Sequence, residues 1–417
     1  MSRLDRRRFL TRSALTLGAV GTGAAIVPGP GDADSERPGE SAPATGALTD
    51  RIPFDGPKQA GILNAPQGHA VFVALDAVAP NAAALGNALQ ALSYRARSLA
   101  TGGRTTALGV DEPTVDSGTL GDDISPDALT ITIGFGASLF DDRYGLAPKK
   151  PANLTPMPRF AVDANLDPTR THGDVLLQIC AGQHDTVTHA LREIMRVVRG
   201  SLELRWVING FQSAPRGPSE KSSGRNLFAF RDGTANPDVT DAGLMDQLVW
   251  STAGEPSWAA GGTYTVVRTI RMQVEFWDRV GLREQENMIG RHRATGAPLG
   301  GTDEFQDPRL DLDPKGERIP LDAHIRLANP RSAKTDAQRI LRRGYNYDRG
   351  FDEAGALDQG LVFVAFNQDP ARQFAAIQER LNDEPMTDYI RPVGGGYFFT
   401  PPGTQNARGW VGDGLFS

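Results

Sequence analysis

Hydrophobic positions in the first half of the chain alternate between strand-like and helix-like spacing. Apolar residues at every second position predict strands at 71–75, 129–135, 175–179 and 202–208. Apolar residues three and four positions apart predict helices over 85–99 and 187–198, ending near Gly102 and Gly200. The resulting order, strand-helix-strand-strand-helix-strand, is that of a ferredoxin-like unit.

The second half repeats this order more loosely. The pattern predicts strands at 263–270, 339–347, 361–366 and 397–399, and helices over 274–282 and 372–381. The segment 283–336 has no sustained periodicity, and irregular segments of this length inside a domain are usually functional. We therefore expect an α+β protein built from tandem ferredoxin-like domains, of the dimeric α+β barrel type. The domains should span 51–220 and 221–417, with a polar Pro/Gly/Ser-rich boundary.

Composition narrows the function classes. The chain has 417 residues, 44 Lys+Arg against 50 Asp+Glu, and a net charge of −6, so no basic footprint for nucleic acid is present. The single Cys180 excludes an intramolecular disulfide framework and cysteine-built zinc or iron–sulfur sites. No apolar run approaches the roughly 20 residues of a membrane span.

The N-terminus has the features of an export signal. Arg6-Arg7-Arg8-Phe9-Leu10 precedes a weakly apolar stretch, 14–27, and a Pro/Gly/Ser/Ala-rich linker. The arginines followed by Phe-Leu are similar to the twin-arginine (Tat) signal; the alternative is a disordered basic tail. We expect residues 1–50 to be signal and linker, and the protein to be exported by the Tat machinery to the periplasm or the extracellular space. Because this route carries folded proteins, often with a cofactor, a cofactor protein is favoured.

Among six histidines, His324 stands apart because it lies inside the long irregular segment. His184 and His189 are five residues apart on a predicted helix, about 140° around its axis, which is wrong for shared metal ligation. From composition alone a lone histidine such as His324 is more often structural. Spacing supports neither a Ser-His-Asp nor a Cys-His arrangement.

Four motifs give the chain a specific resemblance. They are Arg231-Asp232-Gly233-Thr234-Ala235-Asn236-Pro237, the stretch 289–298, His324-Ile325-Arg326-Leu327-Ala328-Asn329-Pro330-Arg331, and the stretch 339–347. Together they resemble the dye-decolourising peroxidase (DyP) family, in particular its Tat-exported branch with the deferrochelatase/peroxidases. The resemblance covers the chain from about residue 50 onward. One departure is visible: Ala229 replaces the first glycine of the family's Gly-x-x-Asp-Gly fingerprint, which affects the local turn because alanine disfavours positive φ.

The resemblance implies a haem b peroxidase with one haem per chain, held in the C-terminal half. His324 would be the proximal iron ligand, Asp232 and Arg342 the distal pair, and Arg331, Arg291 and Asn236 further cofactor contacts. Arg342 matches better than Arg343, and strand alternation allows only one of the two to face the pocket. Asp369 is one candidate acceptor for the ligand histidine's second N–H. Hydrogen peroxide would be reduced through a ferryl intermediate while an organic, dye- or phenol-type donor is oxidised.

Two other functions remain open at the level of sequence. The first is a deferrochelatase or iron-uptake protein that handles haem or ferrous iron with incidental peroxidase activity, which would use the same residues. The second is a cofactor-free ferredoxin-like binding module. The sequence leaves open a homo-oligomer and does not identify the electron donor.

Overall fold

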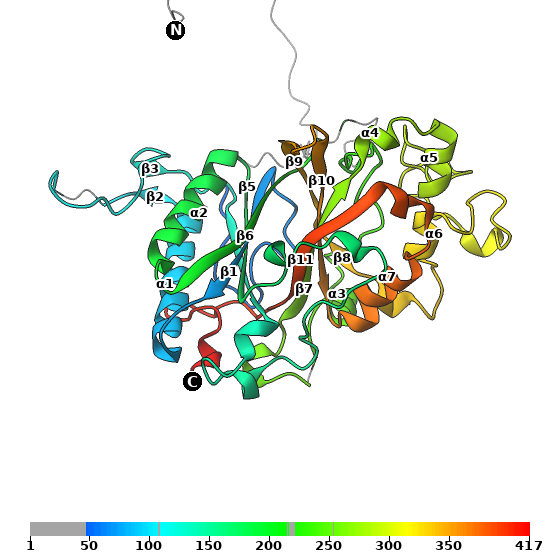
Figure 1. The fold of residues 1–417 in the computed structure, drawn as a ribbon. Coiled ribbons are helices and arrows are strands. Elements are labelled where there is room, and N and C mark those ends of the chain that lie inside the picture. Colours follow the sequence, from blue (N-terminus) through cyan, green and yellow to red (C-terminus); the bar gives the residue numbers. More distant parts are fainter. Residues whose placement is uncertain (1–46, 107–108, 215, 217–221, 253) are drawn as a thin grey trace, which may run out of the picture. The chain divides into compact units, whose positions relative to one another are not determined.

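One nine-stranded antiparallel sheet organises the molecule (Figure 1). The computed structural model describes residues 47–106, 109–214, 216, 222–252 and 254–417, all in a unit spanning Ser41–Ser417. The export signal and the beginning of the linker, residues 1–46, lie outside the described residues. So does the stretch 217–221, which contains the predicted domain boundary.

The first half forms the predicted ferredoxin-like unit. Its strands lie in the order β4-β5-β1-β6, and α1 and α2 pack together on one side (Figure 1). The bounds are β1 His69–Ala77, α1 Ala82–Thr101, β4 Thr130–Gly136, β5 Val175–Ala181, α2 His184–Val198 and β6 Leu202–Phe211. Two short strands, β2 Gly103–Arg104 and β3 Asp123–Ile124, form an excursion between α1 and β4.

The second half has the same strand connectivity, in the order β9-β10-β7-β11. The bounds are α3 Ala242–Leu248, β7 Thr263–Met272, α4 Val274–Trp277, α5 Leu282–Ile289, α6 His324–Ala328, β8 Leu341–Arg342, β9 Tyr345–Phe351, β10 Leu357–Asn367, α7 Ala376–Arg380 and β11 Ile390–Thr400. Helices α5, α6 and α7 lie on the side of the strands away from α1 and α2 (Figure 1). Met245 and Leu248 of α3 pack against the cluster inside the ring of strands. The α+β architecture of tandem ferredoxin-like units is thus confirmed.

The two halves join into a closed ring of strands. β6 pairs with β9, β11 pairs with β4, and β7 pairs with both β10 and β11. Alternation along β1 separates two cores: Val71, Val73 and Leu75 pack with α1 and α2, while Ala70 and Phe72 face the ring interior with residues of β9, β10 and β11. None of the helices in the described ranges has the length and hydrophobicity of a membrane span.

Three local predictions were wrong. The helix expected over 274–282 stops at Trp277, and a separate helix, α5, begins after Gly281. The segment 283–336 is not irregular throughout, because it contains most of α5 and the five-residue α6, which is too short to show a helical period. The strand expected at 339–347 is divided into β8 and β9 around Arg343-Gly344.

Candidate functional site

A cavity lies between the outer face of the β7–β10 pair and the segment that carries α6 and α7. The strands contribute side chains at alternate positions, such as Ile270 and Met272 on β7, because these share one face of the sheet. Much of the lining is apolar and aromatic: Phe228, Phe230, Met272, Leu361, Phe363 and Phe374. Five of the residues singled out in the sequence line this cavity as well: Asp232, Arg291, His324, Arg331 and Arg342.

His324 is the first residue of α6, and a buried acid fixes its ring. Its Nδ1 lies 2.7 Å from Oε2 of Glu384, whose side chain is only 2% exposed. Burial alone would lower the pKa of His324, but the charge and hydrogen bond of Glu384 outweigh it and raise the pKa above its usual value. With Nδ1 engaged, Nε2 is the ring nitrogen left for a ligand, and it has no hydrogen-bond partner among the described residues.

Sequence reasoning missed Glu384 and suggested Asp369 instead, and that suggestion was wrong. The Asp369 carboxylate accepts backbone N–H groups of Ala371 and Arg372, at 2.9 and 3.1 Å, at the start of the turn that leads into α7. Glu384 follows α7 and is 60 residues from His324. No periodicity or motif connects the two positions, so only the fold brings them together.

An arginine of α7 donates hydrogen bonds to the C-terminal carbonyls of α6. Arg380, the last residue of α7, donates from Nε to the carbonyl of Leu327 at 2.8 Å and from Nη2 to that of Ala328 at 3.4 Å. These are carbonyls of the last turn of α6, which lack partners inside so short a helix. The contact fixes the helix that presents His324.

Asp232 and Arg342 form an ion pair in the cavity wall. Arg342 Nη1 lies 2.8 Å from Asp232 Oδ1, and the two side chains are 28% and 27% exposed. Asn236 holds the backbone of Arg342 from both sides: its Oδ1 accepts the Arg342 N–H at 3.1 Å, and its Nδ2 donates to the Arg342 carbonyl at 2.8 Å. Asn236 itself is not among the cavity-lining residues, so the structure assigns it to positioning Arg342.

Arg342 ends β8, and Arg343 follows it in an extended backbone whose N–H donates to the Val364 carbonyl at 2.9 Å. The two arginine side chains therefore point in opposite directions, as alternation along an extended segment requires. Arg342 faces the cavity, whereas Arg343 is 3% exposed and donates to Ala65 O at 3.2 Å and to Asn64 O and Gln67 Oε1. The cavity therefore receives one arginine from this pair.

The turn before Asp232 contains the residue that departs from the family fingerprint. Ala229 has a φ of +68°, the left-handed region that glycine adopts freely and alanine does not. Arg225 braces this turn, since its Nη1 donates to the Ala229 carbonyl at 2.6 Å. The chain keeps the glycine-like backbone and accepts the strain of a Cβ there.

Arg331 and Arg291 differ in how much of the guanidinium is free. Arg331 is 31% exposed, and its Nη1 lies 3.3 Å from Asp307 Oδ2. Arg291 is buried, and its Nη1 donates to the carbonyls of Gly296 and Glu304 at 2.7 and 2.9 Å. Burial, together with the charge of Arg331, lowers the pKa of Arg291 to about 10.

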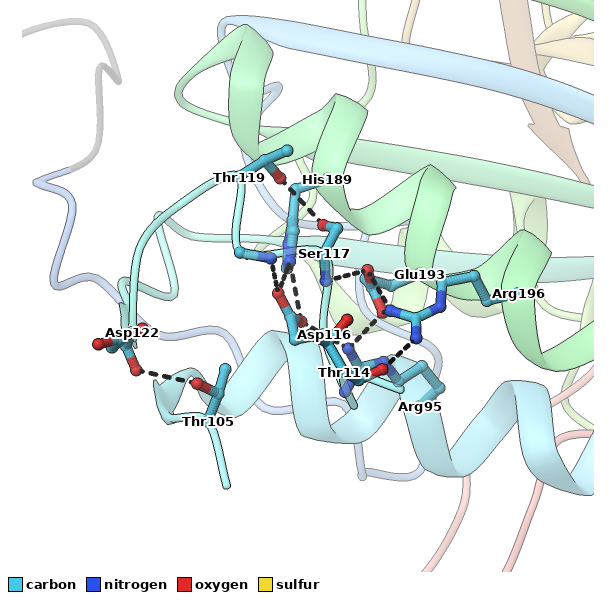
Figure 2. Close-up of polar contacts among 11 residues, drawn as sticks. Arg95, Thr105, Thr114, Asp116, Ser117, Thr119, Asp122, His189, Glu193 and Arg196 are labelled. Atoms are coloured by element: carbon cyan, nitrogen blue, oxygen red, sulfur yellow. Dashed lines mark hydrogen bonds and ion pairs between the residues drawn. The ribbon is translucent and has the colours of Figure 1, made fainter. Parts of the chain in front are cut away.

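Outside the cavity, one further cluster of metal-ligand type occurs within the described ranges: Asp116, His189 and Glu193 (Figure 2). His189 Nε2 lies 3.0 Å from Asp116 Oδ1, but Arg95 Nη2 lies 2.7 Å from both Asp116 Oδ2 and Glu193 Oε2. A guanidinium therefore occupies the position between the two carboxylates that a cation would take. The cluster ties the excursion between β2 and β3 to α1 and α2 and is not a metal site.

Two family models match the chain. The Dyp-type peroxidase N-terminal model matches residues 59–212, and the Dyp-type peroxidase C-terminal model matches residues 223–405.

Curated relatives and solved structures agree with these matches. The chain is 43% identical over 414 residues to a protein named "Deferrochelatase" from Yersinia pestis bv. Antiqua, covering 99% of this chain and 94% of that one. It is 46% identical over 383 residues to the Escherichia coli O6:K15:H31 "Deferrochelatase", covering 90% of both chains. A DyP-type peroxidase from Cellulomonas bogoriensis superimposes with a TM-score of 0.79 at 36% identity, covering 89% and 99% of the two chains. Ferric DtpA from Streptomyces lividans does so with a TM-score of 0.79 at 33% identity, covering 90% and 100%. The chain belongs to the Dyp-type peroxidase family.

Proposed function

We propose that this protein is a haem b peroxidase that reduces hydrogen peroxide and oxidises an organic donor, with His324 as the iron ligand. The observation that carries the proposal is the pairing of His324 with the buried Glu384 in a cavity that also contains the Asp232–Arg342 ion pair. An imidazole with one nitrogen held by a carboxylate is a tuned metal ligand, and a neighbouring acid and arginine suit peroxide chemistry.

The cavity residues fit haem. A porphyrin needs an apolar slot, an axial nitrogen and cationic partners for its two carboxylates. Phe228, Phe363 and Met272 supply apolar surface, and His324 supplies a nitrogen whose tautomer Glu384 fixes. Related DtpA is described as ferric, which supports an iron cofactor in this family. When bound, the haem supplies the redox chemistry.

The chain's own residues would bind, orient and move protons. Glu384 accepts the N–H of His324 and so increases electron donation from Nε2. Asp232 Oδ2 has no hydrogen-bond partner among the described residues, so it would be able to accept a proton from hydrogen peroxide and return it to the oxygen that departs as water. Arg342 remains cationic and stabilises negative charge that develops on that oxygen.

The alternative function is removal or handling of iron from haem. The curated relatives at 43–46% identity are named "Deferrochelatase", and this name supports iron removal from haem as a second candidate function in addition to peroxidase turnover. Recovery of free porphyrin and iron from haem incubated with the protein, without peroxide, would establish it. Peroxide turnover with intact haem and no porphyrin would leave the peroxidase function alone.

Export remains part of the proposal on sequence grounds. The Arg6-Arg7-Arg8-Phe9-Leu10 segment supports recognition by the Tat machinery and a periplasmic or extracellular location. Replacing Arg6 and Arg7 by lysines should retain the protein in the cytoplasm. Unchanged export would contradict this part of the proposal.

Substitution of His324 tests the haem assignment. The His324→Ala protein should purify with most of its haem lost, whereas His292→Ala, at a histidine of the same segment bonded to Glu286, should keep it. Full haem retention and an unchanged Soret band in His324→Ala would remove His324 as the ligand.

A further inference from the structure

The cavity lining carries an excess of positive charge. Seven arginines line it, against two carboxylates, Asp232 and Glu384. Both carboxylates are already engaged, the first by Arg342 and the second by His324. A ligand that fills this cavity is therefore matched best if it brings negative charge.

Two of the arginines are buried, and each forms an ion pair with a buried carboxylate. The side chains of Arg231 and Arg268 are at most 1% exposed, and they pair with Glu304 and Asp163 respectively. They present almost no surface to a ligand, so they cannot bind its charged groups directly.

Two others are used by the protein. Arg291 is buried, and its Nη1 is shared by two backbone carbonyls. Arg380 uses Nε and Nη2 for the α6 carbonyls and Nη1 for Gln338 Oε1 at 2.6 Å. Their hydrogen bonds hold loops and helices, as described above.

Arg331 and Arg339 remain, and both are about one-third exposed. Each has one exposed aspartate as ion-pair partner: Arg331 Nη1 lies 3.3 Å from Asp307 Oδ2, and Arg339 Nε lies 3.7 Å from Asp336 Oδ1. Arg339 Nε donates to the Asp336 carbonyl at 3.2 Å, and neither Nη1 nor Nη2 has a hydrogen-bond partner among the described residues. Its backbone is fixed, because the Arg339 carbonyl accepts Nε2 of the fully buried Gln373 at 2.6 Å. Arg339 thus offers Nη1 and Nη2 to a ligand from an anchored position in the cavity wall, while its Nε is engaged by Asp336.

We propose that Arg339 is a carboxylate-binding residue, which binds one of the two propionates of the haem while Arg331 binds the other. This inference rests on the proposed haem function and replaces Arg291, which the sequence had suggested as a cofactor contact. The sequence placed Arg339 in a motif but gave it no role. In the structure, burial separates Arg343 from it, and the 2.8 Å ion pair with Asp232 separates Arg342 from it.

A free guanidinium that meets a carboxylate forms charge-assisted hydrogen bonds. Such a bond in a partly exposed position contributes about a tenfold difference in affinity. The cavity should therefore discriminate haem from haem dimethyl ester, in which both carboxylates are masked, and Arg339 should carry part of that discrimination.

The test measures how fast the loaded full-length protein loses its cofactor to excess apomyoglobin. Wild type, Arg339→Gln and Arg339→Lys are each loaded with haem or with haem dimethyl ester. Arg349→Gln is the matched control, because Arg349 is an exposed arginine of β9 outside the cavity lining. Thermal unfolding of each loaded protein checks that the fold is retained.

Arg339→Gln should lose haem about tenfold faster than wild type and lose the ester at the wild-type rate, with Arg339→Lys in between. Arg349→Gln should match wild type for both. Equal acceleration for haem and ester, or no acceleration, would overturn the assignment while leaving haem binding intact. A wild-type protein that holds neither cofactor would overturn the proposed function together with the assignment.

Discussion

Replacing Glu384 by glutamine tests how the buried acid acts on the iron ligand. In the wild-type structure, His324 Nδ1 lies 2.7 Å from Glu384 Oε2. Glutamine keeps the shape of the side chain and an acceptor oxygen near this nitrogen, but it removes the negative charge of the carboxylate. A hydrogen bond to a charged group contributes about 1.5–3 kcal/mol and a neutral one about 0.5–1.5 kcal/mol, so the loss is about 1.5 kcal/mol. Because the carboxylate stabilises the ferric state more than the ferrous state, the one-electron potential should rise, by at most about 60 mV if the whole loss falls on the ferric state.

The assay is a spectroelectrochemical titration of the haem-loaded protein. Glu379→Gln serves as control, since Glu379 is an exposed acid of α7 whose carboxylate accepts from Asn382 Nδ2. Glu384→Gln should raise the potential, by at most about 60 mV, and the control should leave it unchanged. A potential that stays constant or falls, or an equal rise in the control, would refute the argument that the Glu384 charge acts through His324.

Three further changes have defined outcomes. Ala229→Gly should increase the unfolding free energy by about 0.5–1 kcal/mol in urea titrations, because relief of the positive φ exceeds the added chain entropy; a less stable variant would contradict the strain. Asp232→Asn should retain haem but react with peroxide about 10²–10⁴-fold more slowly by stopped flow, since the proton acceptor is lost; an unchanged rate would reassign the base. Burial alone would raise the carboxyl pKa values of Asp116 and Glu193, but hydrogen bonds, including those from His189 and Arg95, lower them below 3.8 and 4.5. Their stabilising effect is therefore full above about pH 4.5 and lost as the pH falls through the folded pKa values. Hydrogen exchange in 109–123 should accelerate over that fall in pH, and a pH-independent pattern would argue against this network.

The elements that the sequence predicted well are those whose burial is regular. Val71, Val73 and Leu75 alternate because one face of β1 packs against helices, and the same rule separates Arg342 from Arg343. α6 was not predicted, because its five residues make less than two helical turns and show no helical period. The pairing of β10 keeps one register across Arg343-Gly344, from Ala365 opposite Arg342 to Val362 opposite Tyr345, so the register does not explain the break there.

Some residues of the candidate site could likewise be predicted from the sequence, and others could not. The motifs indicated His324, Asp232 and Arg342, and the fold places all three in one cavity. Glu384 and Arg339 could not be identified from the sequence. Glu384 matters because it contacts His324, 60 residues away, and Arg339 matters because its Nη1 and Nη2 have no partner among the described residues. Asn236 was predicted as a cofactor contact, and its two hydrogen bonds to the Arg342 backbone show a positioning role that the sequence did not reveal.

The most direct test of the central claim is the Soret spectrum of the purified haem-loaded protein before and after one equivalent of hydrogen peroxide. The account predicts a Soret band that shifts within the mixing time of a stopped-flow instrument and returns when an organic donor is added. A Soret band that peroxide leaves unchanged would contradict peroxide activation at the Asp232–Arg342 pair. Absence of a Soret band after haem reconstitution would contradict the haem site itself.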